Sequence, residues 1–234
     1  MRNLILTGGI RHDFDGNTET VIELLGDIGI ASEYTNDIDA GIERLTSETF
    51  DLVTVMALRW RMEGDQKYAA LRDEYGYSMP SKSRAILVNY IRQGGGLFGL
   101  HTACLCFDDW AEWRDVLGGA WIWGQSFHPP LGPVSVARTG QSHTLTTGLP
   151  AFDAVDEVYA GLDLAPDTIP LLFACADDGT EAPVLWAHQL DQGRVVFDAL
   201  GHDRNSLQHD VHGRLIQRCA AWACGFTDER VSAL

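Results

Sequence analysis

The chain has 234 residues, of which 45% are hydrophobic and 21% are charged, and its formal net charge at pH 7 is −16. This length can bury a sizeable core, and we expect residues 1–234 to form one domain rather than two small ones. The acidic balance argues against nucleic acid and anionic membranes as partners, because binding phosphate groups needs clustered Lys and Arg.

The start of the chain and its cysteines predict a cytoplasmic protein. The segment MRNLILTGGI is apolar for only a few residues, and no later run approaches the length of a membrane span. The five cysteines are odd in number and lie in apolar stretches, as expected of reduced thiols rather than of a disulfide framework. Cys104 and Cys106 have no second cysteine pair beside them, so their spacing does not favour a structural zinc knuckle.

The first half alternates predicted strands with predicted helices. Residues 3–9 form an apolar strand that ends in glycines, and the helical spacing of the next apolar residues ends at Gly29. Strands are expected over 30–35 and 51–58, the second being a continuous apolar run typical of the middle of a parallel sheet.

The middle of the chain continues this alternation. A further helical stripe follows Pro80 and precedes a strand over 96–100. A short helix is expected next, with Asp108 or Asp109 as its cap and Gly118 at its end. Such a β-α-β alternation predicts a parallel sheet with helices on both faces, in which ligands bind beyond the carboxyl ends of the strands.

The second half is richer in strands. Short strands are expected over 132–138, 156–162 and 169–175. Residues 183–200 alternate on both sides of an Asp-Gln-Gly turn, which predicts a β-hairpin, and a final helix follows with its apolar residues on one face. The predicted fold class is therefore α/β, with a mainly parallel sheet, helices on both faces and an added β-hairpin region.

Three of the eight histidines fall at the carboxyl ends of predicted strands. His12, His101 and His202 follow the first strand, the middle strand and the hairpin, respectively. Imidazole at such a rim can act as a base near neutral pH or as a metal ligand. Any one of them alone is better explained as a hydrogen-bonded loop residue, whereas with three at one rim a site is as good an explanation. The histidines of the hairpin and the last helix are interpreted as surface or capping residues: His188, His209 and His212.

Several segments together resemble the ThuA-like, or trehalose-utilisation, family. They are TGGIRHDFDG, GGGLFGLHTA, SHTLTTGLPAFDAVDEVY and the closing GRVVFDALGHD with AAWACG, and they span nearly the whole chain in order. The resemblance implies a flavodoxin-like fold related to the class I glutamine amidotransferases.

Amidotransferases of that fold carry a nucleophile elbow, G-x-C-x-G, in which a tight turn holds a cysteine thiolate above the sheet. The matching residues here run from Gly99 to Ala103, and His101 stands where the cysteine would be. A downstream His-x-Glu pair is also missing, because His202 is followed by Asp and Arg. These missing residues exclude glutamine hydrolysis through a thioester. The family resemblance implies a protein of sugar catabolism.

The histidine at the elbow has two expected roles. It can take a proton from a sugar hydroxyl or from the carbon beside a keto group, and His202 and Glu157 are the other catalytic candidates. Alternatively, it can bind a divalent metal such as zinc with other histidines and a carboxylate. The expected metal ligands are His101, His128 and His202, with His12 and Glu157 as further candidates.

Glu157 and several aromatic residues complete the expected pocket. Glu157 shares a predicted strand face with Val155 and Tyr159, so it is either a buried ligand or a residue of the sheet edge. Flat aromatic rings suit the C–H faces of a sugar, and they also pack in cores. The expected substrate contacts are His12, His128, Trp60, Trp123 and Tyr159. The tryptophans assigned to the core are Trp113, Trp186 and Trp222.

Three classes of function stay open at this point. The first, which the resemblance favours, is an enzyme acting on trehalose, related disaccharides or their 3-keto derivatives. The second is a non-catalytic binder of sugars or metabolites, and the third is a structural subunit with a decayed amidotransferase-like site. The histidines retained in the family motifs disfavour the third class. A small carbohydrate is the expected partner in the first two, and a homo-oligomer is compatible with all three.

Overall fold

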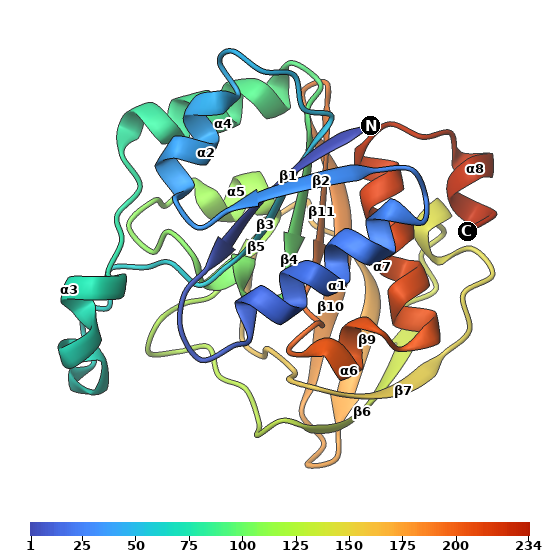
Figure 1. Ribbon diagram of the computed structural model, residues 1–234. Coiled ribbons are helices and arrows are strands. Elements are labelled where there is room, and N and C mark those ends of the chain that lie inside the picture. The colour runs from blue at the N-terminus through green and yellow to red at the C-terminus, as the bar shows by residue number, and fades with distance from the viewer.

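A nine-stranded sheet with helices on both faces forms the body of the protein, which the computed structural model describes over residues 1–234 (Figure 1). The strands of this sheet are β1 Arg2–Gly8, β2 Ala31–Thr35, β3 Leu52–Ala57, β4 Gly96–Leu100, β6 Gly132–Arg138, β7 Phe152–Asp156, β9 Pro170–Ala176, β10 Glu181–Leu190 and β11 Gly193–Asp198. Their order across the sheet is β2-β1-β3-β4-β11-β10-β9-β6-β7. A separate ribbon pairs β5 Gly119–Ala120 with β8 Asp163–Leu164.

The sheet has a parallel half and an antiparallel half. The strands from β2 to β11 in that order run parallel, and the strands from β11 to β7 pair antiparallel. The predicted hairpin is confirmed as β10 and β11, which are joined through Asp191 at a φ of +53° and Gln192. The α/β fold class expected from the sequence is thus confirmed.

The helices form a layer on each face of the sheet. Helices α1 and α7 pack together on one face, and α2 and α4 pack together on the other (Figure 1). The helices are α1 Phe14–Gly26, α2 Ile38–Arg44, α3 Arg72–Tyr75, α4 Ser81–Arg92, α5 Trp113–Leu117, α6 Arg204–Leu207, α7 Asp210–Ala223 and α8 Asp228–Ser232, with 3-10 turns η1 Gln66–Leu71, η2 His101–Leu105 and η3 Thr144–Thr146. No helix is both long enough and apolar enough to cross a membrane.

Local sequence signals explain where these elements begin and end. Helix α1 begins at Asp13, whose carboxylate accepts from the Gly16 N–H and so satisfies a free donor of the first turn. The chain reverses after α1 at Gly29, which has a φ of +81°. Every residue of β3 is buried, as its continuous apolar run predicts. The core is one cluster of 65 buried residues. It contains the three tryptophans assigned to it: Trp113, Trp186 and Trp222.

The predicted cap of α5 is wrong. Neither Asp108 nor Asp109 caps this helix, which begins after Glu112 and has no side-chain cap. Asp108 pairs instead with Arg61, and Asp109 pairs with Arg84 of α4. Such an ion pair competes with a local cap for the same carboxylate. Gly118 ends the helix in the left-handed conformation, as predicted.

The strand predicted over 156–162 is also misplaced. β7 ends at Asp156, and the chain leaves the sheet from there on. Val155 is 47% exposed whereas Glu157 is 8% exposed, so the two side chains do not share a face. Glu157 is therefore buried, and the sheet-edge interpretation of this residue is wrong.

Of the histidines interpreted as surface or capping residues, one differs from expectation. His209 caps α7, as predicted, by accepting from the Val211 N–H. His212 is fully buried and paired with Asp198, so it is not a surface residue. His188 is half-buried in the hairpin.

Candidate functional site

His101 lies at a sharp turn between β4 and η2. Its φ is +47°, in the left-handed region that residues with a side chain rarely adopt. Gly99 makes room for the turn, because a Cβ at this position would lie 2.5 Å from Leu117 and 3.3 Å from the Cβ of Ala103. The structure therefore has the elbow expected from the sequence, with an imidazole at its tip.

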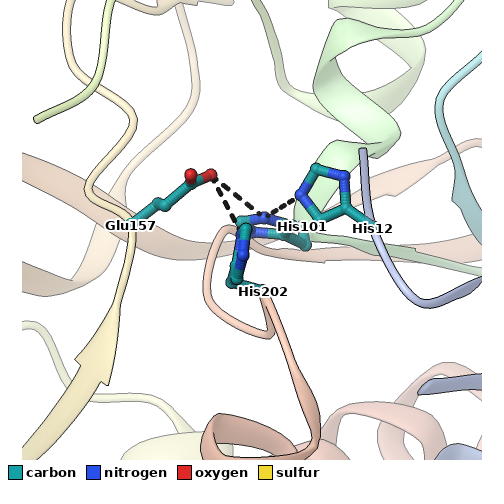
Figure 2. A group of neighbouring side chains, drawn as sticks. All are labelled: His12, His101, Glu157 and His202. Carbon is teal, nitrogen blue, oxygen red and sulfur yellow. Dashed lines mark hydrogen bonds and ion pairs between the residues drawn. The ribbon is translucent and has the colours of Figure 1, made fainter. Parts of the chain in front are cut away.

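Four side chains from separate segments converge above this edge of the sheet (Figure 2). They are His12, His101, Glu157 and His202, and one ligating atom from each lies within 4.8 Å of all the others. His12 Nε2 is 3.1 Å from His101 Nε2. Glu157 Oε2 is 3.6 Å from His101 Nε2 and 3.3 Å from His202 Nδ1. The three rim histidines thus meet at one place, because β1, β4 and β11 are parallel and end at the same edge.

Backbone carbonyls fix the ring protons of two of these histidines. His101 Nδ1 is 2.7 Å from the carbonyl oxygen of Ala199, and His12 Nδ1 is 3.4 Å from that of Ile10. A carbonyl oxygen can only accept, so each Nδ1 carries a proton, and in the neutral ring each Nε2 presents a lone pair. The two Nε2 atoms lie 3.1 Å apart. Two facing lone pairs repel each other unless a proton or a cation lies between them.

Tyr159 brings a hydroxyl to the same place. Its oxygen is 2.8 Å from His101 Nε2, and its ring stacks on the imidazole with the centroids 4.6 Å apart. Burial raises the pKa of Tyr159 well above its ordinary value, and the charge of Glu157 adds to this effect. The phenol is therefore protonated at neutral pH and can donate a hydrogen bond within the cluster.

Burial and mutual contacts also shift the pKa values of three cluster members. Burial lowers the pKa of His12 to about 3, and the charges of His101 and His202 act in the same direction. Burial raises the pKa of Glu157, but its contacts with His101 and His202 outweigh this effect, so the pKa of the carboxyl lies well below its ordinary value. Contact with Glu157 raises the pKa of His202 against the opposing effect of burial. At neutral pH the cluster therefore holds an ionised Glu157 and a neutral His12.

The donor set and its spacing fit a divalent cation. Zinc–nitrogen bonds of about 2.0–2.1 Å place neighbouring ligands of a tetrahedral site about 3.3 Å apart. Three of the separations in the cluster are 3.1, 3.3 and 3.6 Å, and the others lie within 4.8 Å. Three imidazoles and a carboxylate suit zinc or a similar divalent metal. The Ala199 carbonyl that orients His101 is the kind of partner that metal-binding histidines usually have.

His128 lies outside this ligating set, although the sequence predicted it as a ligand. Its Nδ1 is 2.9 Å from the Pro129 carbonyl oxygen, so this nitrogen carries a proton and cannot ligate. The same nitrogen lies 3.5 Å from Glu157 Oε1, and the side chain is 39% exposed. His12, predicted as a substrate contact and only as a further candidate ligand, takes the place in the ligating set that His128 was expected to have.

A cavity of about 940 Å³ opens in front of the cluster. Its lining includes His12, His128, Glu157, Tyr159, His202 and Trp123. Trp60 does not line it, contrary to expectation, because its side chain is only 1% exposed. It stacks behind Trp123 instead, with the ring centroids 4.7 Å apart and the planes at 10°. Trp60 therefore supports the wall that Trp123 forms.

The wall residues that were not predicted from the sequence include Trp121 and Arg11. Trp121 lines the cavity and meets Tyr159 edge-on at 5.4 Å between centroids. Arg11 also lines the cavity. It directly precedes His12 in the same loop and has a φ of +72°. Each is next to or near a predicted site residue in sequence. In an irregular loop, however, no periodicity tells which of two neighbours faces a cavity.

The chain matches a family model and resembles several solved structures. Residues 2–223 match the model of the ThuA family, which is described as trehalose utilisation. A thua-like protein from Parabacteroides merdae ATCC 43184 is 17% identical over 96% of this chain and 90% of its own, with a TM-score of 0.73. A thua-like protein from Bacteroides uniformis ATCC 8492 is 17% identical over 96% of this chain and 91% of its own, with a TM-score of 0.65. A cytoplasmic protein from Salmonella typhimurium LT2 is 12% identical over 95% of this chain and 99% of its own, with a TM-score of 0.63. At these identities the structures show a shared fold. A comparison with curated proteins gave no match.

Proposed function

Because the chain belongs to the ThuA family of trehalose utilisation, we propose that it is an enzyme of sugar catabolism that uses a divalent cation such as zinc. The proposed substrate is trehalose, a related disaccharide or a 3-keto derivative of one. One observation carries the proposal: the ligating atoms of His12, His101, Glu157 and His202 converge beside a cavity lined by aromatic rings. We further propose that it works in the cytoplasm, in keeping with its free cysteines.

The side chains around the cluster divide the work on a bound sugar. A bound cation would polarise a hydroxyl or carbonyl oxygen of the substrate. Glu157 directs Oε2 toward the histidines, which leaves Oε1 on the side of His128, where it can accept a hydrogen bond from a sugar hydroxyl. Tyr159 keeps its proton and can donate a hydrogen bond to an oxygen on which negative charge develops. Trp123 offers a flat face for the C–H groups of the sugar ring.

We do not expect glutamine hydrolysis from this protein. The tip of the elbow is His101, and the nearest thiols belong to Cys104 and Cys106, which are both buried. Burial raises the pKa of Cys104 well above its ordinary value and that of Cys106 to about 12. Both therefore stay protonated at neutral pH, and a protonated thiol is a poor nucleophile.

The proposal is tested by measuring cation binding and turnover on the same sample. Metal-free protein is titrated with Zn²⁺ by calorimetry and then incubated with trehalose, other disaccharides and their 3-keto forms, with products followed by mass spectrometry. We expect one cation per chain and turnover of at least one sugar. Glu157→Gln should lower turnover by more than the roughly 10–100-fold that loss of an outer partner costs, because it removes a cation ligand. Glu229→Gln, at an exposed position far along the chain, is the matched control.

The outcomes separate the classes of function. Sugar binding without turnover would contradict the enzyme and favour a binding protein. Turnover that is unchanged by a chelator would contradict the role of the cation. Binding of neither cation nor sugar would contradict the whole proposal.

A further inference from the structure

A connected set of buried polar side chains lies next to the candidate site and takes no part in the chemistry proposed above. Its members are Asp156, Asp198, Ser206 and His212, each at most 1% exposed. Burying such groups is unfavourable unless they are hydrogen-bonded, and these four bond to one another and to the backbone. Their arrangement shows what they hold in place.

Asp156 accepts hydrogen bonds from both sides of the site. Its Oδ1 accepts from the backbone N–H of Glu157 at 2.8 Å and from that of His202 at 3.2 Å. Its Oδ2 accepts from the N–H of Gly201 at 2.8 Å and from the hydroxyl of Ser206. One carboxylate thus ties together the backbones of Glu157 and His202, whose side chains face each other in the cluster.

His212 anchors this carboxylate to the rest of the fold. Its Nε2 is 3.1 Å from Asp198 Oδ2, and its Nδ1 is 2.8 Å from the carbonyl oxygen of Ser206 and 3.0 Å from the Ser206 hydroxyl. Both ring nitrogens face acceptors, so the ring is a cation that pairs with Asp198. The order Ser206, His212, Asp198 is that of a hydrolase triad. It cannot work as one here, because all three side chains are buried and the serine hydroxyl donates to Asp156.

The network fixes the short segment from Ala199 to His202. The Leu200 N–H donates to Asp198 at 3.0 Å, and the next two N–H groups donate to Asp156. The Ala199 carbonyl in the same segment accepts from His101 Nδ1. This segment therefore orients His101 through its carbonyl and carries His202 directly.

We propose that Asp156 is a positioning residue for the site: its carboxylate holds Glu157 and His202 at the separation and orientation that binding a cation requires. It does so without touching the cation or the sugar. Partners of this kind typically contribute 10–100-fold to metal affinity.

The test compares two substitutions of Asp156 in the full chain, with Co²⁺ as the probe. Asp156→Asn keeps one oxygen that can accept from Glu157 and His202 and turns an amide toward Gly201, so we expect about tenfold weaker Co²⁺ binding. Asp156→Ala removes every acceptor, and we expect a loss of up to about 100-fold together with a changed Co²⁺ absorption spectrum. If the Ala variant does not fold, the Asn variant alone decides.

Asp108→Asn is the matched control. Asp108 is also a largely buried aspartate that accepts a backbone N–H, that of Arg61 at 3.0 Å, but it does not line the cavity. This variant should lose some thermal stability and keep wild-type Co²⁺ affinity and spectrum. Asp156→Asn with wild-type affinity and spectrum would overturn the proposal, as would an equal loss of affinity in the control.

The cation measurement rests on the proposed function, and a second measurement is independent of it. If the wild type binds no Co²⁺, the proposed function fails, and crystal structures of both Asp156 variants then decide the positioning role. If the distance from Glu157 Oε2 to His202 Nδ1 stays at the 3.3 Å of the wild type, the positioning role is overturned. A displaced Glu157 or His202 would support it.

Discussion

At the scale of single residues, His101 serves both the turn and the site. Its left-handed backbone is unfavourable for a residue with a side chain, and its ring is held by the Ala199 carbonyl on one side and by Tyr159 on the other. These contacts leave Nε2 directed at His12 and Glu157. The backbone strain is thus balanced by contacts that also aim the ring.

Replacing His101 with Asn should separate these two roles. Asn adopts left-handed conformations more readily than most residues, so the turn should persist and stability should fall by only about 1–3 kcal/mol. Loss of Nε2 should weaken Co²⁺ binding by more than the roughly 100-fold upper range for outer partners. Thermal unfolding and calorimetric titration measure both effects, with His188→Asn in the hairpin as the control. Weakened folding with unchanged affinity would make His101 a packing residue.

Trp123 should affect the sugar and not the cation. Its ring lies in the cavity wall, is backed by Trp60, and is not a member of the ligating set. Trp123→Ala removes the apolar face on which the sugar ring would lie, so disaccharide binding should weaken by roughly tenfold. Titrations of the sugar and of Co²⁺ check the two halves of this expectation. Unchanged sugar affinity would exclude Trp123 from the binding surface.

At the scale of elements, strand ends were predictable where the sequence carried its own punctuation. The glycines after β1 and the turn of the β10–β11 hairpin marked boundaries that placed His12 and His202 at the rim. The end of β7 had no such signal, because "AVDEVY" continues to alternate after the chain has left the sheet at Asp156. The cap of α5 failed for a related reason, since Asp108 and Asp109 pair with residues distant in sequence.

The His212–Asp198 pair between α7 and β11 makes a prediction about pH. Burial lowers the pKa of His212, but the charge of Asp198 and its hydrogen bond outweigh burial, so the folded pKa lies above the unfolded value of about 6.5. The charged His212 therefore adds fully to the free energy of unfolding below about pH 6.5, and this contribution is lost as the pH rises through the pKa of His212 in the folded state. Within that window the slope reaches about 1.4 kcal/mol per pH unit.

Urea unfolding at several pH values from 6 to 9 measures this effect. The wild type should lose stability with rising pH across the window, and His212→Gln should show a flatter dependence although it is less stable throughout. An equal slope in both proteins would show that His212 is not charged in the folded state.

At the scale of the whole molecule, the topology explains why part of the site could be predicted. Parallel strands end at one edge, so the three histidines that follow β1, β4 and β11 had to come close together. Glu157 follows β7, the far edge strand in the order, yet it reaches the same cluster because β7 runs beside α6, which follows His202 (Figure 1). Strand order in the antiparallel half decides this contact, and no local pattern in the sequence specifies that order.

The most direct test of the central claim is X-ray diffraction at the zinc absorption edge from crystals of protein saturated with Zn²⁺. The cluster predicts one anomalous peak per chain, about 2.0–2.1 Å from His12 Nε2 and from His101 Nε2, with Glu157 and His202 completing the coordination. Crystals that show no peak between these residues, or peaks only at other side chains, would contradict a cation site in this protein.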